Sequence, residues 1–261
     1  MSTVMVGDIT VHYTTAGSGP PVVLLHGLAE DHRSWSHVQA QLSDYTTYAL
    51  DLRGHGSTTR GEGDGSLKQL GHDLIGFLEQ VTGPAAVVGF SLGGTIVLWG
   101  AAERPDLLIH PIPVATSSIV GRAAAKYFAG RIAQIERGDH SGFAAGMRQD
   151  TAQQVVTDVD LDALVAYRLE AVGSGEGYMN AARAMIGLRT TRLTPRLTHI
   201  KTHVDVIGAD RDLFCPRKAA DIMIDALPDA TYHEIAGASH LIAVDQPAAF
   251  ISLLARLLKR S

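Results

Sequence analysis

The sequence predicts an α/β fold, with a mostly parallel, twisted sheet of about eight strands and helices on both faces. Short apolar and β-branched runs alternate with amphipathic segments along most of the 261 residues. Several runs, such as VVLL at 22–25 and AAVV at 85–88, show no polar alternation, which is typical of parallel strands buried on both faces. The length suits one large α/β domain.

Seven strands can be placed on runs rich in Val, Ile, Leu and Thr. The first is expected to be an antiparallel edge strand, and the others to be parallel. In chain order they lie near Ile9–Thr15, Val22–His26, Thr46–Leu50, Ala86–Gly89, Ile109–Ala115, His203–Ile207 and Thr231–Ile235.

Helices are expected where apolar residues recur at helical spacing between these strands. Those segments lie near Ser34–Leu42, Leu67–Val81, Leu92–Glu103, Arg217–Ala226 and Ala248–Leu258. Strand and helix therefore alternate, with one exception.

The exception is the stretch from Ser117 to Leu197, which contains no convincing strand and four segments with helical spacing. We expect a helical subdomain at 117–197, inserted into a core formed by 1–116 and 198–261. Long insertions of this kind are frequently lids over a binding site. A bundle that merely thickens the domain is the alternative.

Composition favours a small-molecule partner. The formal charge of −5 is mild, and Lys and Arg form no stripe, so no nucleic-acid surface is indicated.

The single cysteine, Cys215, cannot form an internal disulfide, and the N-terminus lacks the pattern of a secretory signal, so we expect a cytoplasmic protein. Residues 85–102 carry no charge, but four glycines interrupt them, which favours a buried strand and helix over a membrane span. Whether the protein is a monomer or a homo-oligomer stays open.

Residues 89–93 read GFSLG and match the pattern G-x-S-x-G, with a predicted strand before them and a predicted helix after them. In that context the serine occupies a sharp turn, and the flanking positions must lack side chains that would collide with the strand and helix. Backbone N–H groups at the helix N-terminus would lie beside its hydroxyl.

Over nearly its full length the sequence resembles the α/β-hydrolase superfamily, and within it the cap-bearing serine hydrolases, which include esterases, enol-lactonases, C–C hydrolases and perhydrolases. The resemblance implies a Ser, Asp, His triad in that chain order and a helical cap after the sixth strand. Five segments carry it: HGLAEDHRSW at 26–35, DLRGHGST at 51–58, GFSLGG at 89–94, GADRDLFCP at 208–216 and GASHLIAVDQP at 237–247.

The expected catalytic residues are Ser91, His240 and Asp212. A serine hydroxyl needs a base whose pKa is near 7, and histidine offers one without a large shift. His240 follows the last predicted strand, where the superfamily also has its base. The acid that orients it should follow the preceding strand. Asp212 fits better than Asp210, although the superfamily's acid usually lies one residue closer to the glycine that corresponds to Gly208.

Two backbone N–H groups, those of Leu28 and Leu92, are expected to form the oxyanion hole. No metal or cofactor site is indicated, and the polar cluster in DLRGHGST is interpreted as scaffolding. The side chains expected to form the wall of an apolar substrate pocket are Phe90, Tyr127, Phe128, Phe143, Met147, Tyr178 and Met185.

These residues predict a serine hydrolase that cleaves an apolar carboxylic ester or lactone through an acyl-enzyme. A serine nucleophile argues against epoxide hydrolases and haloalkane dehalogenases, which need a carboxylate. A C–C bond hydrolase acting on vinylogous ketones, a perhydrolase, and a small-molecule receptor with a vestigial triad remain as alternatives.

Overall fold

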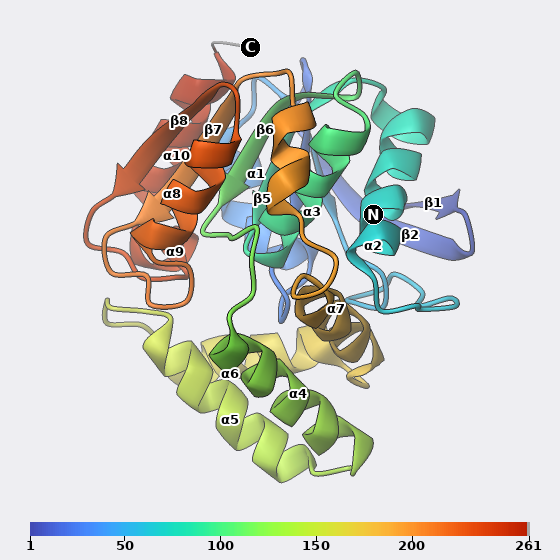
Figure 1. Ribbon diagram of the computed structural model, residues 1–261, viewed down its shortest axis with the longest axis vertical. Coiled ribbons are helices and arrows are strands. Elements are labelled where there is room, and N and C mark those ends of the chain that lie inside the picture. The colour runs from blue at the N-terminus through green and yellow to red at the C-terminus, as the bar shows by residue number, and fades with distance from the viewer. Residues whose placement is uncertain (260–261) are drawn as a thin grey trace.

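The computed structural model describes residues 1–259 and has an eight-stranded sheet at its centre (Figure 1). The strand order is β1-β2-β4-β3-β5-β6-β7-β8. The strands are β1 (Ser2–Val6), β2 (Ile9–Ala16), β3 (Pro21–Leu25), β4 (Thr46–Leu50), β5 (Ala85–Phe90), β6 (Leu108–Val114), β7 (Val204–Ala209) and β8 (Ala230–Ile235).

The sheet is mostly parallel, because only the pairs β1–β2 and β2–β4 are antiparallel. The expected antiparallel strand near Ile9–Thr15 is present as β2, but it is not the edge. β1 lies outside it, paired from Ser2 opposite Tyr13 to Val6 opposite Ile9. β1 is mostly exposed, so it lacks the apolar alternation from which a strand is recognised.

Helices cover both faces of the sheet, and alternate side chains of the central strand β3 pack against the two helix layers. In β3, Val23 and Leu25 pack on one face with α2 (Leu67–Phe77) and α3 (Leu92–Glu103). Val22 and Leu24 pack on the other face with α1 (Ser36–Gln41) and α10 (Pro247–Leu258), as the two-residue period of a strand requires. The helices of the two layers and the short helices beside them are η1 (His32–Trp35), α1 (Ser36–Gln41), α2 (Leu67–Phe77), η2 (Leu78–Thr82), α3 (Leu92–Glu103), η3 (Thr194–His199), α8 (Arg217–Ala226), α9 (Ile242–Asp245) and α10 (Pro247–Leu258).

Four further helices lie between β6 and β7, where the sequence predicts an all-helical insertion. They are α4 (Arg122–Glu136), α5 (His140–Gln153), α6 (Leu161–Val172) and α7 (Glu176–Gly187). Figure 1 shows them grouped beyond one edge of the sheet, with α7 next to the sheet-covering layers. They share a small core, in which Phe143, Met147 and Tyr178 are buried together with Ala29 from the loop after β3.

The uncharged stretch 85–102 forms β5 and all of α3 except its last residue, as expected for a buried strand and helix. Every residue of α3 from Leu92 to Ala102 is buried. None of the helices in residues 1–259 has both the length and the hydropathy required to cross a membrane.

Candidate active site

Ser91 occupies a strained turn between β5 and α3. Its φ is +51° and its ψ is −113°, a region that residues with side chains rarely adopt. A Cβ added at Gly89 would lie 2.3 Å from the carbonyl oxygen of Gly93, and one at Gly93 would lie 2.4 Å from that of Leu25. Both glycines are therefore required by the close approach of strand and helix.

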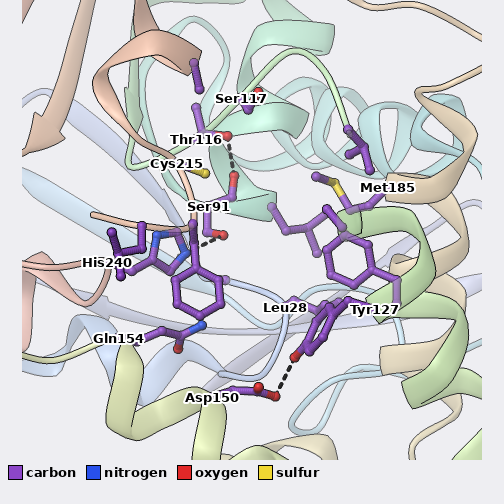
Figure 2. Close-up of a pocket in the computed structure, with 18 of the residues that line it drawn as sticks. Leu28, Ser91, Thr116, Ser117, Tyr127, Asp150, Gln154, Met185, Cys215 and His240 are labelled. Atoms are coloured by element: carbon purple, nitrogen blue, oxygen red, sulfur yellow. Dashed lines mark hydrogen bonds between the residues drawn. The ribbon is translucent and has the colours of Figure 1, made fainter. Parts of the chain in front are cut away.

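The strand next to β5 holds this turn in place. The Ser91 N–H donates to the carbonyl oxygen of Val114 at 2.8 Å. The Thr116 hydroxyl donates to the carbonyl oxygen of Ser91 at 2.6 Å (Figure 2). Because the backbone is fixed on both sides, the Ser91 side chain has a defined direction toward the cavity.

The structure brings Ser91, His240 and Asp212 together. His240 Nε2 lies 3.0 Å from Ser91 Oγ, as Figure 2 shows, and His240 Nδ1 lies 2.8 Å from Asp212 Oδ2. Ser91 and His240 are 149 residues apart in the chain, and they meet because the loops after β5 and β8 lie at the same edge of the parallel sheet.

The two candidate acids occupy different environments. Asp212 is buried, and its Oδ1 accepts from the N–H groups of Phe214 at 2.7 Å and Cys215 at 2.9 Å. Burial alone would raise the pKa of Asp212, but His240 and these N–H groups hold it below its usual value. Asp210 is exposed, and its carboxylate accepts from backbone N–H groups of the loop before His240. Of the two acids, Asp212 is the one that contacts the imidazole.

The loop that carries His240 is hydrogen-bonded through Asp245 to the helical segment, which comprises α4 to α7 and their connections. The buried Asp245 carboxylate accepts from the Ser239 N–H at 2.7 Å and from the Val156 N–H at 2.9 Å. Thr157 donates to the same carboxylate through its N–H and its hydroxyl. One buried carboxylate therefore links the imidazole-bearing loop to the segment after α5.

The peptide group between Gly27 and Leu28 is held by His26. The Leu52 N–H donates to His26 Nε2 at 2.9 Å, so His26 Nδ1 carries the proton and donates to the Gly27 carbonyl oxygen at 2.7 Å. Burial, followed by the neighbouring His55, lowers the pKa of His26 to about 4, which keeps the ring neutral. In a trans peptide the N–H points away from the C=O, so the Leu28 N–H points away from His26.

A cavity of about 590 Å³ opens beside Ser91 and His240. It lies between the sheet edge and the helical segment, and its wall is largely apolar (Figure 2). The apolar and aromatic side chains that line it are Leu28, Phe90, Leu92, Ile119, Val120, Tyr127, Phe128, Met147, Tyr178, Met185, Leu213, Phe214 and Ile222.

Most of the expected pocket residues line this cavity, together with both expected oxyanion residues. Phe143 does not. It is buried in the small core of the helical segment, where its ring packs edge-to-face on Tyr178 with centroids 5.3 Å apart. Helical spacing places a residue on an apolar face, but it does not tell a cavity from a neighbouring helix.

Several polar side chains that were not predicted from the sequence also line the cavity. They include Glu30, Asp150, Gln154 and Arg168. Asp150 accepts from the Tyr127 hydroxyl at 2.5 Å, and burial together with this acid raises the pKa of Tyr127 to about 12. Charged residues on helices, such as Asp150 and Arg168, are most often solvent-exposed, so helical spacing did not identify these two as cavity residues.

Asp51, in the polar cluster of DLRGHGST, forms hydrogen bonds with other residues of the fold. Asp51 accepts from the backbone of Ser57 and from the backbone and Nδ1 of His32, and His12 Nδ1 lies 2.9 Å from its second oxygen. His12, His32 and Asp51 lie close enough to hold a cation, as do Asp212, Cys215 and His240. In both groups the carboxylate oxygens already accept hydrogen bonds from protein donors.

A model of the alpha/beta hydrolase family matches residues 22–253, and the chain belongs to that family. 3-Oxoadipate enol-lactonase 2 of Acinetobacter baylyi is 26% identical over 257 residues, which cover 97% of this chain and 94% of that protein. Pimeloyl-(acyl-carrier protein) methyl ester esterase of Chromobacterium violaceum is 29% identical over 254 residues, covering 94% and 96%.

Solved structures share the fold. The enol-lactonase of Burkholderia xenovorans LB400 superimposes with a TM-score of 0.88, at 22% identity, over 99% of this chain and 100% of that one. Together these likenesses define an alpha/beta hydrolase with enol-lactonase and methyl ester esterase relatives.

Proposed function

We propose that this protein is a serine hydrolase that cleaves a carboxylic ester or a lactone through an acyl-enzyme. One observation carries the proposal: a continuous chain of hydrogen bonds runs from the buried Asp212 through His240 to Ser91, and it ends in an apolar cavity. The names of two relatives, an enol-lactonase and a methyl ester esterase, support an ester or lactone bond.

The first step transfers a proton from Ser91 to His240. The lowered pKa of Asp212 keeps that acid ionised, so it accepts from His240 Nδ1. The imidazole therefore presents an unprotonated Nε2 to Ser91 Oγ at 3.0 Å. As Oγ bonds to the substrate carbonyl carbon, its proton moves to Nε2, and Asp212 stabilises the imidazolium.

The carbonyl oxygen takes up the negative charge and is held by the N–H groups of Leu28 and Leu92. The Leu92 N–H lies at the start of α3, where the helix dipole is positive. The Leu28 N–H belongs to the peptide that His26 fixes. Neither donor depends on a side chain at positions 28 and 92.

Collapse of the intermediate breaks the bond between the acyl carbon and the leaving oxygen, which receives the proton from His240 Nε2. The product is an alcohol, or the open hydroxyl end of a lactone that stays attached to the acyl group. Water then attacks the acyl-enzyme, with His240 taking a proton from the water and returning it to Ser91.

In this proposal residues 117–197 act as a cap over a core made of 1–116 and 198–261. Tyr127, Met147 and Tyr178 on α4, α5 and α7 line the same cavity as Ser91. The cap would therefore exclude water from the acyl group and shape the substrate pocket.

The test is a panel of p-nitrophenyl esters, γ- and δ-lactones and vinylogous ketones, assayed with the native protein and with Ser91→Ala. Turnover of an ester or lactone that Ser91→Ala loses by about 10⁴-fold or more supports the proposal. Turnover of ketones alone would replace it with C–C hydrolysis. Absence of any turnover, with native folding intact, would favour a receptor.

A further inference from the structure

Arg168 is a buried cation in the wall of the cavity. It belongs to α6, is 6% exposed and lines the same cavity as Ser91. Its Nη1 donates to the Thr151 hydroxyl at 2.9 Å and also to the Gln154 side-chain oxygen. Both acceptors are neutral, so neither balances the charge of the guanidinium.

Within residues 1–259 no Asp or Glu forms an ion pair with Arg168. The contrast with Arg53 is direct, because that side chain is similarly buried and donates to both Asp8 and Asp73. The buried Nε of Arg168 has no hydrogen-bond partner among the described residues. A buried charge without a directly paired carboxylate is costly, so the native fold retains a cation that no acidic side chain contacts.

The other acids of the cavity do not fill this role. Asp150 is already paired with Arg131 at 2.8 Å and with Tyr127. Glu30 accepts from the Gly27 N–H at 3.2 Å. Burial raises the pKa of Glu30, whereas the nearby Arg168 charge lowers it, and no ion pair joins the two side chains within residues 1–259.

One edge of the Arg168 guanidinium, formed by the buried Nε and by Nη2, has no acceptor within residues 1–259. Nη1 is occupied by Thr151 and Gln154, whereas Nε and Nη2 donate no hydrogen bond to the described part of the chain. Parallel N–H groups on one guanidinium edge match the two oxygens of a carboxylate. Gln154 lies in the same region, between Asp150 and His240 (Figure 2), and its amide nitrogen is a further donor.

We propose that Arg168, with Gln154 beside it, binds a free carboxylate of the substrate. The inference rests on the proposed function and narrows it. The substrate is then an ester or lactone that carries a second, ionised carboxylate besides the bond that is cleaved. This departs from the wholly apolar substrate expected from the sequence, while the apolar wall of the cavity accommodates the carbon chain between the two groups.

The first experiment compares esters that differ only in this charge. Monomethyl succinate, glutarate and adipate are assayed against methyl esters of the monocarboxylic acids with the same number of carbons. The native protein is expected to prefer at least one of the anionic esters by about 10-fold or more in kcat/KM. Arg168→Gln should lose most of this preference, because KM should rise far more for the anionic esters than for the neutral esters.

The matched control is Arg189→Gln, because Arg189 is exposed and this substitution also removes one positive charge. It should leave the preference intact. Equal loss of both substrate types in a folded Arg168→Gln protein would overturn the proposal, as would a native protein without preference. If Arg168→Gln does not fold, Arg168→Lys is measured instead, and an unchanged preference in that variant overturns the proposal because Lys lacks the fork.

A binding measurement separates this proposal from the proposed function. Calorimetric titration of Ser91→Ala with succinate, glutarate and adipate requires no catalysis. Binding of one of them that is at least about 10-fold weaker in Ser91→Ala/Arg168→Gln supports the carboxylate site even if no ester is ever hydrolysed. Absence of binding by all three, or equal binding by both variants, would contradict it while ester turnover by the native protein still stood.

Discussion

His26 Nδ1 lies 2.7 Å from the carbonyl oxygen of Gly27, and the peptide that carries this oxygen also carries the Leu28 N–H. His26 does not line the cavity, yet it sets the direction of a proposed oxyanion donor. Its other nitrogen is occupied by the Leu52 N–H, so the tautomer is fixed.

His26→Ala should therefore impair turnover more than binding. We expect kcat to fall by about 10²-fold, the effect of losing one oxyanion donor, with KM changed much less. His37→Ala is the control, since His37 is exposed. Steady-state kinetics and circular dichroism check this, and a His26→Ala protein that keeps its fold and its native kcat would contradict it.

The two acids near His240 should behave differently when made neutral. Asp212→Asn should lower kcat/KM by about 10⁴-fold, because the imidazole loses the carboxylate that fixes its tautomer and stabilises its charge. Asp210→Asn should retain activity to within about 10-fold, since within residues 1–259 the Asp210 carboxylate accepts only from backbone N–H groups of the loop. The reverse result would move the acid to Asp210.

Gly93 and Gly130 differ in how much space surrounds them. A Cβ at Gly93 would lie 2.4 Å from the Leu25 carbonyl oxygen, whereas one at Gly130 in α4 meets nothing within 4 Å. Gly93→Ala should lower the free energy of unfolding by about 3 kcal/mol. Gly130→Ala should raise it by about 0.5–1 kcal/mol, because alanine is the better helix former. Urea denaturation distinguishes the two, and equal effects would contradict the account of the turn.

Asp205 predicts a loss of stability in acid. This buried carboxylate accepts from His110 at 2.8 Å and His233 at 2.6 Å, and although burial opposes them, these contacts lower its pKa from 3.8 to about 2. A depressed pKa stabilises the folded state above pH 4, and this contribution is lost as the pH falls from 4 toward 2.

The shift corresponds to about 2 kcal/mol of the free energy of unfolding at pH 7. Asp205→Asn should remove most of it at pH 7, and the difference from the native protein should shrink progressively below pH 4. Urea denaturation of both proteins at pH 7 and at pH 3 measures this difference in the free energy of unfolding. A difference that is the same at pH 7 and pH 3 would show that the carboxylate charge contributes nothing.

The fold could be predicted from the sequence where local pattern and function coincide. Close packing requires the buried runs of β3 and β5 and the glycines around Ser91. Each of these features can be recognised from a short stretch of consecutive residues. β1 was missed because its side chains are mostly exposed. The four helices between β6 and β7 were predicted, because their apolar spacing is local to each segment.

The polar part of the cavity could not be predicted. Arg168 lies on α6, and helical spacing does not tell whether its side chain points to solvent or into a cavity. Phe143 illustrates the same limit, because it shares the apolar character of the cavity residues but packs on Tyr178. Which faces of the four helices meet is decided by packing between segments distant in sequence, and no single stretch encodes it.

The most direct test of the central claim is reaction with a fluorophosphonate, followed by intact mass and peptide mapping. We expect one adduct per chain, on Ser91. It should be absent from Ser91→Ala and form much more slowly in His240→Gln, but it should still form in Ser117→Ala, which removes another hydroxyl of the cavity. A folded native protein whose mass does not change, or an adduct on any other residue, would contradict it.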